Sequence, residues 1–235
     1  MKRILTAALL CFAFSQMDAQ VTFRPGVRAG VNFSHFTEGD NYDNGSVYDP
    51  QTQQYYRNRP AEFNSKTDFY VGLYGALKLS KFYTLQPELN YSRQGSKVEW
   101  AQYNTNTHSY IQNDTQIDVS YISIGLINKF TFADKFNLHI GPTVDVIVDK
   151  NRNRYYYDDV NIDPALGYNY YYDDYYDTES DIDLAFVLGV GYNFTKNLGI
   201  EARVKKGIIP VFDFWDNNHT NVVFSAGLNY TFDIK

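Results

Sequence analysis

The fold is decided by the stretch Val222-Val223-Phe224-Ser225-Ala226-Gly227-Leu228-Asn229-Tyr230-Thr231-Phe232. Every second residue from Val222 to Phe232 is apolar, and most of these side chains are large. The residues between them, from Ser225 onward, are small or polar. Side chains alternate between the two faces of a β-strand, so this pattern indicates a strand with one bulky apolar face and one small polar face.

The same alternation recurs upstream. Together with the last strand it gives eight segments, which cover residues 27–34, 69–79, 85–92, 121–126, 138–146, 183–194, 200–205 and 222–232. Short turns fall near 80–81, 133–135 and 195–197, and they alternate with long polar segments at 37–66, 96–114, 149–181 and 208–219. Short turns at one end and long loops at the other are typical of a transmembrane barrel.

Lipid offers no hydrogen-bond partners, so only helices and closed sheets can span it. The sequence therefore predicts an all-β protein, an eight-stranded antiparallel transmembrane β-barrel with short periplasmic turns and long external loops. The alternative is a soluble sandwich or lipocalin-like fold, whose apolar face would point inward. It is disfavoured because its outer surface would then be the face rich in Gly and Ser.

Composition excludes several other classes. Aromatic residues make up 17% of the 235 residues, and 22 of them are Tyr. Disordered chains are poor in aromatic residues, and coiled coils are dominated by Ala, Glu, Lys and Leu. The formal net charge of −6 argues against a nucleic-acid partner, because a phosphate backbone needs a basic surface.

The N-terminus predicts export. Lys2 and Arg3 precede an apolar run at residues 4–14, and the small residue Ala19 follows. We expect residues 1–19 to be a signal peptide and residues 20–235 to be a single barrel domain in the cell outer membrane. The one cysteine, Cys11, lies within this signal. The mature domain would therefore contain no disulfide and no thiol chemistry.

Several motifs also resemble a known family. They are the segment Gly26–Ser34, the segment Leu85–Gly95 with Pro87 near its start, the run Tyr121–Ile124 and the later pair Gly141-Pro142. Together they resemble the small outer-membrane β-barrels of Bacteroidota-type Gram-negative bacteria, often labelled porin family or PorT-like. Gly125 departs from the proline that members commonly carry there, and the chain ends on Lys235 rather than on an aromatic residue. The resemblance implies the barrel fold and the location, not transport.

An eight-stranded barrel has an interior that side chains can fill. The alternation directs two tyrosines, Tyr70 and Tyr74, and a set of charged residues inward, namely Arg28, Lys78, Glu88, Asp145, Glu201, Arg203 and Lys205. Opposite charges in a narrow interior should pair, because an isolated buried charge is costly. We expect a polar network that plugs the lumen. A narrow passive channel for small solutes is the alternative.

Catalysis and metal binding have weak signals. Ser34 and His35 are adjacent and point to opposite faces of a strand, whereas His108 and Ser109 share a polar segment with Asp114. No spacing fixes the geometry that a nucleophile and its base need, so an enzyme is not expected, although a lipid-modifying enzyme stays as a distant alternative. The acidic segment 149–180 lacks the ligand pattern of a calcium loop, so no metal or other cofactor is expected.

The same acidic segment is rich in tyrosine. Tyrosine offers a large contact area at low entropic cost and is common in binding loops. An extended hairpin is the compatible alternative. We therefore expect an external contact surface for an extracellular protein, a glycan or lipopolysaccharide, formed by Tyr155, Tyr156, Tyr157, Tyr170, Tyr171, Tyr172, Tyr175 and Tyr176.

Overall fold

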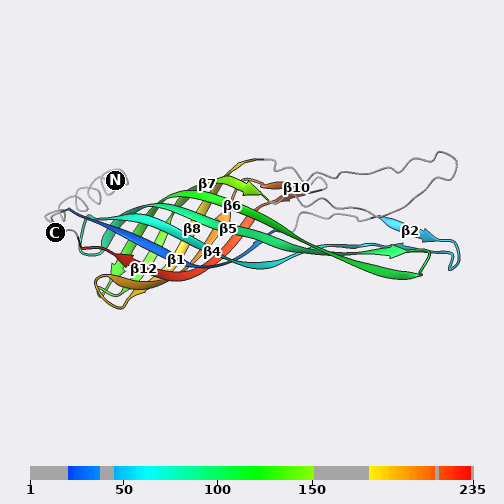
Figure 1. The fold of residues 1–235 in the computed structure, drawn as a ribbon, viewed down its shortest axis with the longest axis horizontal. Helices are drawn as coiled ribbons and strands as arrows, with labels where there is room; N and C mark the ends of the chain where they lie inside the picture. Colours follow the sequence, from blue (N-terminus) through cyan, green and yellow to red (C-terminus); the bar gives the residue numbers. More distant parts are fainter. Residues whose placement is uncertain (1–20, 38–44, 151–179, 215–216, 234–235) are drawn as a thin grey trace, which may run out of the picture.

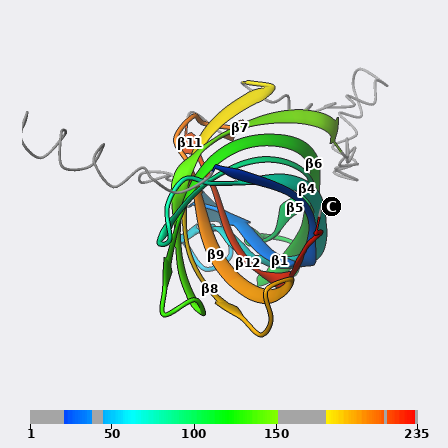
Figure 2. The ribbon, with the colours of Figure 1, turned by 90° about the vertical axis from the view of Figure 1, so that its left-hand side faces the viewer.

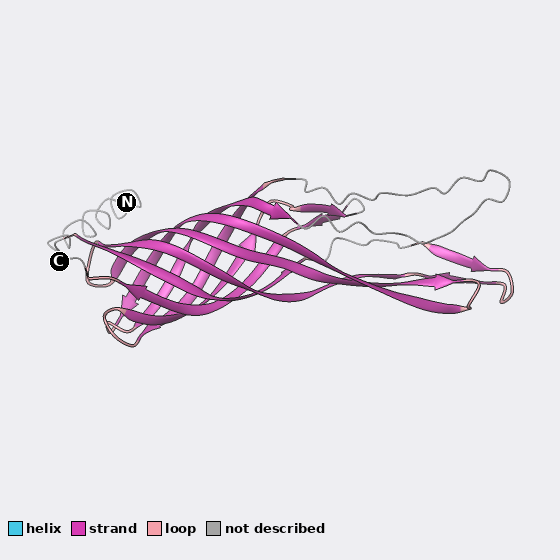
Figure 3. Ribbon diagram, viewed as in Figure 1, coloured by secondary structure: helices cyan, strands magenta, loops and turns pink. Residues whose placement is uncertain are grey.

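The structure is a computed structural model, and it describes residues 21–37, 45–150, 180–214 and 217–233. Its regular structure within these ranges is entirely β (Figure 3). No helix in the described ranges is long and apolar enough to cross a membrane. The strands are β1 (Thr22–Phe36), β2 (Ser46–Asp49), β3 (Gln54–Arg57), β4 (Arg59–Lys78), β5 (Tyr83–Asn104), β6 (Ser109–Phe132), β7 (Phe136–Lys150), β8 (Ile182–Asn193), β9 (Leu198–Gly207), β10 (Phe212–Phe214), β11 (Asn217–His219) and β12 (Asn221–Thr231).

Eight of these strands form a closed antiparallel barrel. Their order around the ring is β1-β12-β9-β8-β7-β6-β5-β4, and Figure 2 looks into the ring from the end where the chain terminates. The first strand closes the ring by pairing with the last, from Gly26 opposite Thr231 to Phe36 opposite Asn221. The predicted eight-stranded barrel is confirmed. Two short hairpins, β2–β3 and β10–β11, lie outside the ring.

Apolar and polar side chains are distributed in the barrel in the opposite way to a soluble protein. On the outside, Leu73, Ile124 and Val190 expose 58%, 59% and 59% of their surface. On the inside, Asn32, Glu88 and Glu201 expose 1%, 4% and 3%. An apolar outer face against lipid and a polar inner face are what the alternating sequence predicts for a membrane-spanning barrel.

Both termini of the described barrel lie at the end that carries the short turns (Figure 1). Ala133 and Asp134 adopt positive φ angles of 49° and 59°, which lets the β6–β7 turn reverse within a few residues. Aromatic pairs lie at this end, including Phe136 with Tyr192 and Tyr230 with Phe232, at ring distances of 5.2 Å each. Such pairs suit the membrane interface, and short turns mark the periplasmic side.

The external side differs from the expectation of long loops. The segment 96–114 is not a connecting loop, because β5 and β6 stay paired residue for residue from Tyr83 opposite Phe130 to Asn104 opposite Ser109. We call the part of β4, β5 and β6 beyond the barrel, residues 59–66, 97–104 and 109–116, together with the β2–β3 hairpin, the arm. From Gly95 to Asn104 the arm extends about 30 Å at about 3.3 Å per residue. It projects to the right in Figure 1.

The arm was not predicted because it lies outside the membrane, where neither face meets lipid, although Val98, Ala101 and Tyr103 on β5 are buried. Without lipid on one side, the sequence does not need the alternating large apolar residues that mark the membrane strands. Polar residues can then occur on either face of the sheet. The backbone nevertheless keeps its ladder, since each unpaired amide would have to find another partner. Regions expected as loops at 37–66 and 208–219 likewise contain β2, β3, the start of β4, β10 and β11.

Gly95 marks the point where the arm leaves the barrel. Its φ is +149°, a conformation that residues with side chains rarely adopt, and an added Cβ would lie 1.9 Å from the carbonyl oxygen of Ile117. The Ser34 hydroxyl accepts a hydrogen bond from the Gly95 amide at 2.8 Å and donates one to its carbonyl at 2.9 Å. Register shifts at Ser65/Tyr70 and Ser120/Tyr121 occur near the same level. The backbones of β4, β5 and β6 are therefore all irregular at the level where the arm begins.

We predict that Gly95→Ala lowers the free energy of unfolding by about 2 kcal/mol, because alanine strains this backbone conformation and meets the neighbouring strand. Urea unfolding of the barrel refolded in lipid vesicles measures the change. Gly125→Ala is the control, since its nearest neighbour is a side-chain methyl of Thr143 at 3.1 Å rather than backbone. Equal effects of the two substitutions would show that Gly95 has no special role.

Candidate functional site

The lumen is crossed by charged side chains from strands that do not pair with one another. In the ring order, β5 and β9 are four strands apart in either direction and therefore stand on opposite walls. Strand β1 lies two strands from each of them. Glu88 on β5, Arg203 on β9 and Arg28 on β1 all point inward and are at most 6% exposed. Any bond between Glu88 and Arg203 thus spans the barrel.

These residues form a cross-lumen ion network with Glu201, which also lies on β9. Arg203 donates to both carboxylate oxygens of Glu88, at 2.8 and 2.9 Å. Arg28 donates to Glu88 at 2.6 Å and to Glu201 at 2.7 Å. Arg203 also donates to Glu201 at 3.0 Å. Two positive and two negative groups are therefore balanced, which offsets part of the cost of burying them.

Neutral groups complete the shell around the network. Gln86 donates to Glu88 at 2.7 Å, and the Tyr70 hydroxyl donates to Glu201 at 3.3 Å. The Arg28 guanidinium lies 4.7 Å above the centre of the Tyr70 ring. His139, on β7 opposite β1, approaches Glu201 at 3.8 Å. Buried charges need such partners. Among the described residues, Arg203 Nε and both ring nitrogens of His139 have no hydrogen-bond partner, so the network is not fully satisfied.

More side chains occupy the lumen on the external side of the network. Lys205 bonds to Asp145, and both are largely buried. Above them Phe36, Val119, Tyr121 and Val211 form an apolar cluster against which Phe63 and Ile117 pack. A chamber of about 50 Å³ lies next to Arg28 and Arg203 and is lined further out by Lys205 and Val223. A cavity of this volume has room for a few water molecules. Charged and apolar side chains therefore lie across the described lumen at successive levels.

The charged residues expected inside are thus distributed over three places. Arg28, Glu88, Glu201 and Arg203 meet in one network, and Asp145 and Lys205 form a separate pair. Lys78 joins neither and lines a cavity at the periplasmic mouth. Sequence reasoning did not assign Gln86 or His139 to the network, although both lie on inward positions of the alternating pattern.

We predict that Glu88→Gln lowers the free energy of unfolding by about 3 kcal/mol, because two buried guanidinium groups lose their shared carboxylate. Urea unfolding in lipid vesicles measures the loss. Glu99→Gln on the arm makes the same change at an exposed position and should alter stability by less than about 0.5 kcal/mol. A Glu88 variant as stable as the control would mean that the network contributes nothing to the barrel.

The tip of the arm is organised around one carboxylate, Asp49, which is fully buried. Tyr103 donates its hydroxyl to Asp49 at 2.8 Å, and His108 Nδ1 lies 2.6 Å from the same oxygen. The amides of Gln51 and Thr52 donate to the other oxygen at 2.9 and 3.3 Å. Burial alone would raise the pKa of Asp49, but these hydrogen bonds lower it to about 2. The pKa of the Tyr103 hydroxyl is raised by burial and by its bond to Asp49.

Aromatic rings fasten the β2–β3 hairpin to the rest of the arm. Tyr56 stacks on Tyr103 with ring centres 3.9 Å apart and planes 5° from parallel. Tyr110 meets the edge of Tyr103 at 5.4 Å, and Arg59 lies over Tyr110 at 5.1 Å. Tyr55, on the outer side, exposes 74% of its surface. The tip therefore combines an ordered interior with exposed aromatic surface.

We predict that the tip loses order in acid. The pKa of Asp49 in the folded tip, about 2, lies below the ordinary value of 3.8, so its stabilising contribution is complete above about pH 4 and disappears as the pH falls towards 2. Hydrogen exchange of the amides in residues 46–57, started at pH 5 and at pH 2.5 and corrected for intrinsic rates, measures it. In Asp49→Asn the difference between the two pH values should vanish. A pH effect that persists in this variant would assign it to another group.

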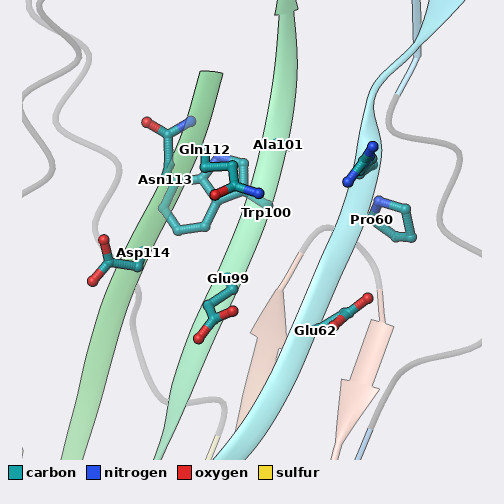
Figure 4. A pocket seen from close by; sticks show the side chains of 9 residues that line it. Pro60, Glu62, Glu99, Trp100, Ala101, Gln112, Asn113 and Asp114 are labelled. Carbon is teal, nitrogen blue, oxygen red and sulfur yellow. The ribbon is translucent and has the colours of Figure 1, made fainter. Parts of the chain in front are cut away.

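A shallow pocket of about 320 Å³ lies on the arm (Figure 4). Glu62 on β4, Glu99 on β5 and Asp114 on β6 are register partners on three neighbouring strands. Like charges directly opposite one another destabilise a sheet. Arg59 supplies the one basic side chain of the described lining, and Gln112 and Asn113 add amides. The pocket thus offers hydrogen-bond acceptors together with a few donors.

The remaining expected sites are placed as follows. The contact surface between Tyr155 and Tyr176 lies outside the described residues. His108 contacts Asp49 rather than Asp114, and the Ser109 hydroxyl bonds to Thr107 at 2.9 Å. Ser34 is engaged with the Gly95 backbone. Among the described residues, no group of three or more His, Cys, Asp or Glu side chains is arranged to hold a metal ion.

The comparison with family models agrees with this architecture. A family model described as outer membrane protein beta-barrel domain matches residues 14–213. No curated protein matches the sequence. Three solved structures are similar in fold: Neisserial surface protein A (15% identity, 91% of this chain and 100% of that one, TM-score 0.47), Ail of Yersinia pestis in complex with the heparin analogue sucrose octasulfate (11%, 89% and 99%, 0.43) and OprG of Pseudomonas aeruginosa (12%, 92% and 99%, 0.43).

Proposed function

We propose that this chain, which belongs to the outer membrane protein beta-barrel domain family, is a surface-recognition protein whose barrel is an anchor and whose arm contacts an extracellular partner. The observation that carries the proposal is the contrast between the two ends of the same strands. Strands β5 and β6 pass from a lumen that the cross-lumen ion network spans into an ordered arm with exposed aromatic residues and a polar pocket. Ordered structure far outside the membrane serves contact with other molecules rather than passage through the barrel.

The pocket chemistry favours a glycan. Carboxylates accept hydrogen bonds from sugar hydroxyls, whereas amide and guanidinium groups donate to ring and hydroxyl oxygens. The three acidic side chains outnumber the single Arg59 in the lining. A neutral or amino sugar therefore suits the pocket better than a sulfated ligand such as the heparin analogue bound to Ail. The exposed rings of Tyr55 and Tyr110 offer additional contact area near the tip.

The sequence adds three elements to the proposal. Residues 1–19 would be removed as a signal peptide, leaving residues 20–235 as one barrel domain, and sequencing the N-terminus of the exported protein tests this. The second is membership of the PorT-like subgroup of Bacteroidota-type barrels, a proposal that the motifs around Pro87 and Gly141 support. The tyrosine-rich segment 155–176 would extend the contact surface, because such residues favour binding.

The experiment measures binding of the mature protein in lipid nanodiscs to an array of neutral, amino and sulfated glycans. We predict that Glu99→Gln weakens glycan binding about tenfold, because a charged acceptor is lost from the pocket. Asp134→Asn makes the same change on a periplasmic turn and should have no effect. Deletion of residues 155–176 measures the separate contribution of that segment.

Planar-bilayer recording of the same protein tests the alternative, a narrow channel. A silent bilayer with folded protein, together with glycan binding that depends on Glu99, supports recognition. Stepwise currents that change in Glu88→Ala, without any glycan binding, would replace the proposal with passive transport. Binding that is equally strong in both carboxylate variants would remove the pocket from the proposal.

A further inference from the structure

The periplasmic mouth of the barrel contains a cavity of about 300 Å³, which the recognition function does not use. Its volume is at the lower end of the range for small-molecule sites. Strands β1, β4, β5, β6 and β12 contribute to its walls, and so does the β8–β9 turn. Inward it reaches Gln86, which donates to Glu88 in the cross-lumen ion network. The cavity is therefore a vestibule that opens to the periplasm and ends at that network.

The charges around this vestibule are unbalanced. Its lining contains five basic side chains and one acidic side chain, Asp134; the basic ones are Arg24, Lys78, Lys81, Lys129 and Lys196. Asp233 pairs with Arg24 at 2.7 Å and with Lys196 at 3.1 Å. Within the described ranges, no ion pair joins the other three lysines to a carboxylate. Three lysines thus share the cavity with Asp134 as the single carboxylate of its described lining, and none of the three forms an ion pair with it.

The neutral lining is suited to oxyanions. Thr22, Thr84 and Thr131 bring hydroxyl groups, and Asn193 and Asn229 bring amides. Lys129 on β6 and Lys78 on β4 share the register partner Thr84 on β5, two residues from Gln86, and Lys129 is the least exposed of the three lysines. Hydroxyl, amide and ammonium donors around one cavity match the acceptor oxygens of phosphate and carboxylate groups.

We propose that the vestibule binds a small polyanion of the periplasm, one that carries two or more phosphate or carboxylate groups. Lys78 and Lys129 bind it from neighbouring walls, and Lys81 contributes from the β4–β5 turn. Because the cross-lumen ion network closes the inner end, the polyanion is held at the mouth and does not pass through. The site is independent of the arm, so it stands whether or not the arm recognises a glycan.

Isothermal titration of the mature protein in non-ionic detergent tests the site, with pyrophosphate and citrate as probes and glucose as the uncharged comparison, at matched ionic strength. We predict that one or both anions bind and that glucose does not. Which of the two binds more tightly distinguishes phosphate from carboxylate chemistry. Lys129→Gln and Lys78→Gln should each weaken binding about tenfold, because each removes a charged donor.

Lys135→Gln is the matched control, since Lys135 lies exposed on the β6–β7 turn at the same end of the barrel and outside the cavity lining. Its binding constant should equal that of the unmodified protein. Lys78 is exposed, so Lys78→Gln should fold normally. This variant therefore tests the site even if Lys129→Gln impairs folding. Absence of anion binding to the folded protein, or equal weakening in the Lys135 variant, would overturn the proposal.

Discussion

The need to pair every backbone amide and carbonyl inside lipid is the constraint on which this structure depends. Unpaired groups cost several kcal/mol each in a medium without hydrogen-bond partners. Closure of β1 against β12 removes the last free edge of the sheet. Once the ring is closed, the two faces of every strand meet different media, and the large apolar side chains must lie outside. The inverted distribution of exposure follows from this closure.

Closure also determines what the interior can contain. Eight strands leave a space that side chains can bridge, so charges from opposite walls come within hydrogen-bonding distance. Glu88 and Arg203 meet in this way, and Arg28 and Glu201 complete a neutral cross-lumen ion network. The network lies between two parts of the molecule. The basic vestibule is on its periplasmic side, and the rest of the lumen and the arm are on its external side. Each proposed binding site occupies one side of this division.

Outside the membrane, water can pair with backbone groups, so strand pairing is no longer required. The hydrogen-bond ladder between β5 and β6 nevertheless continues. Strands β5 and β6 stay paired to the tip of the arm. There Asp49 contacts two side chains and accepts hydrogen bonds from two backbone amides. This part was expected as a loop, because the usual sign of a membrane strand is the difference between its two faces. In water both faces can be polar, so the pattern disappears although the strands continue. The contacts of Asp49 with Tyr103 and His108 had no local signal, because these two partners lie more than fifty residues away along the chain.

What the sequence determined by itself is the class of fold and the face on which each membrane-strand residue lies. Alternation with period two is a local property of a strand between two media, so the residues from Val222 to Phe232 were enough to reveal it. Only the tertiary structure decided which inward residues meet. Lys78 and Glu88 both point inward, yet one lines the vestibule and the other joins the cross-lumen ion network. Lys78 and Glu88 lie at different heights along the barrel axis, and Glu88 on β5 faces β9 across the lumen. Both relations are properties of the closed ring.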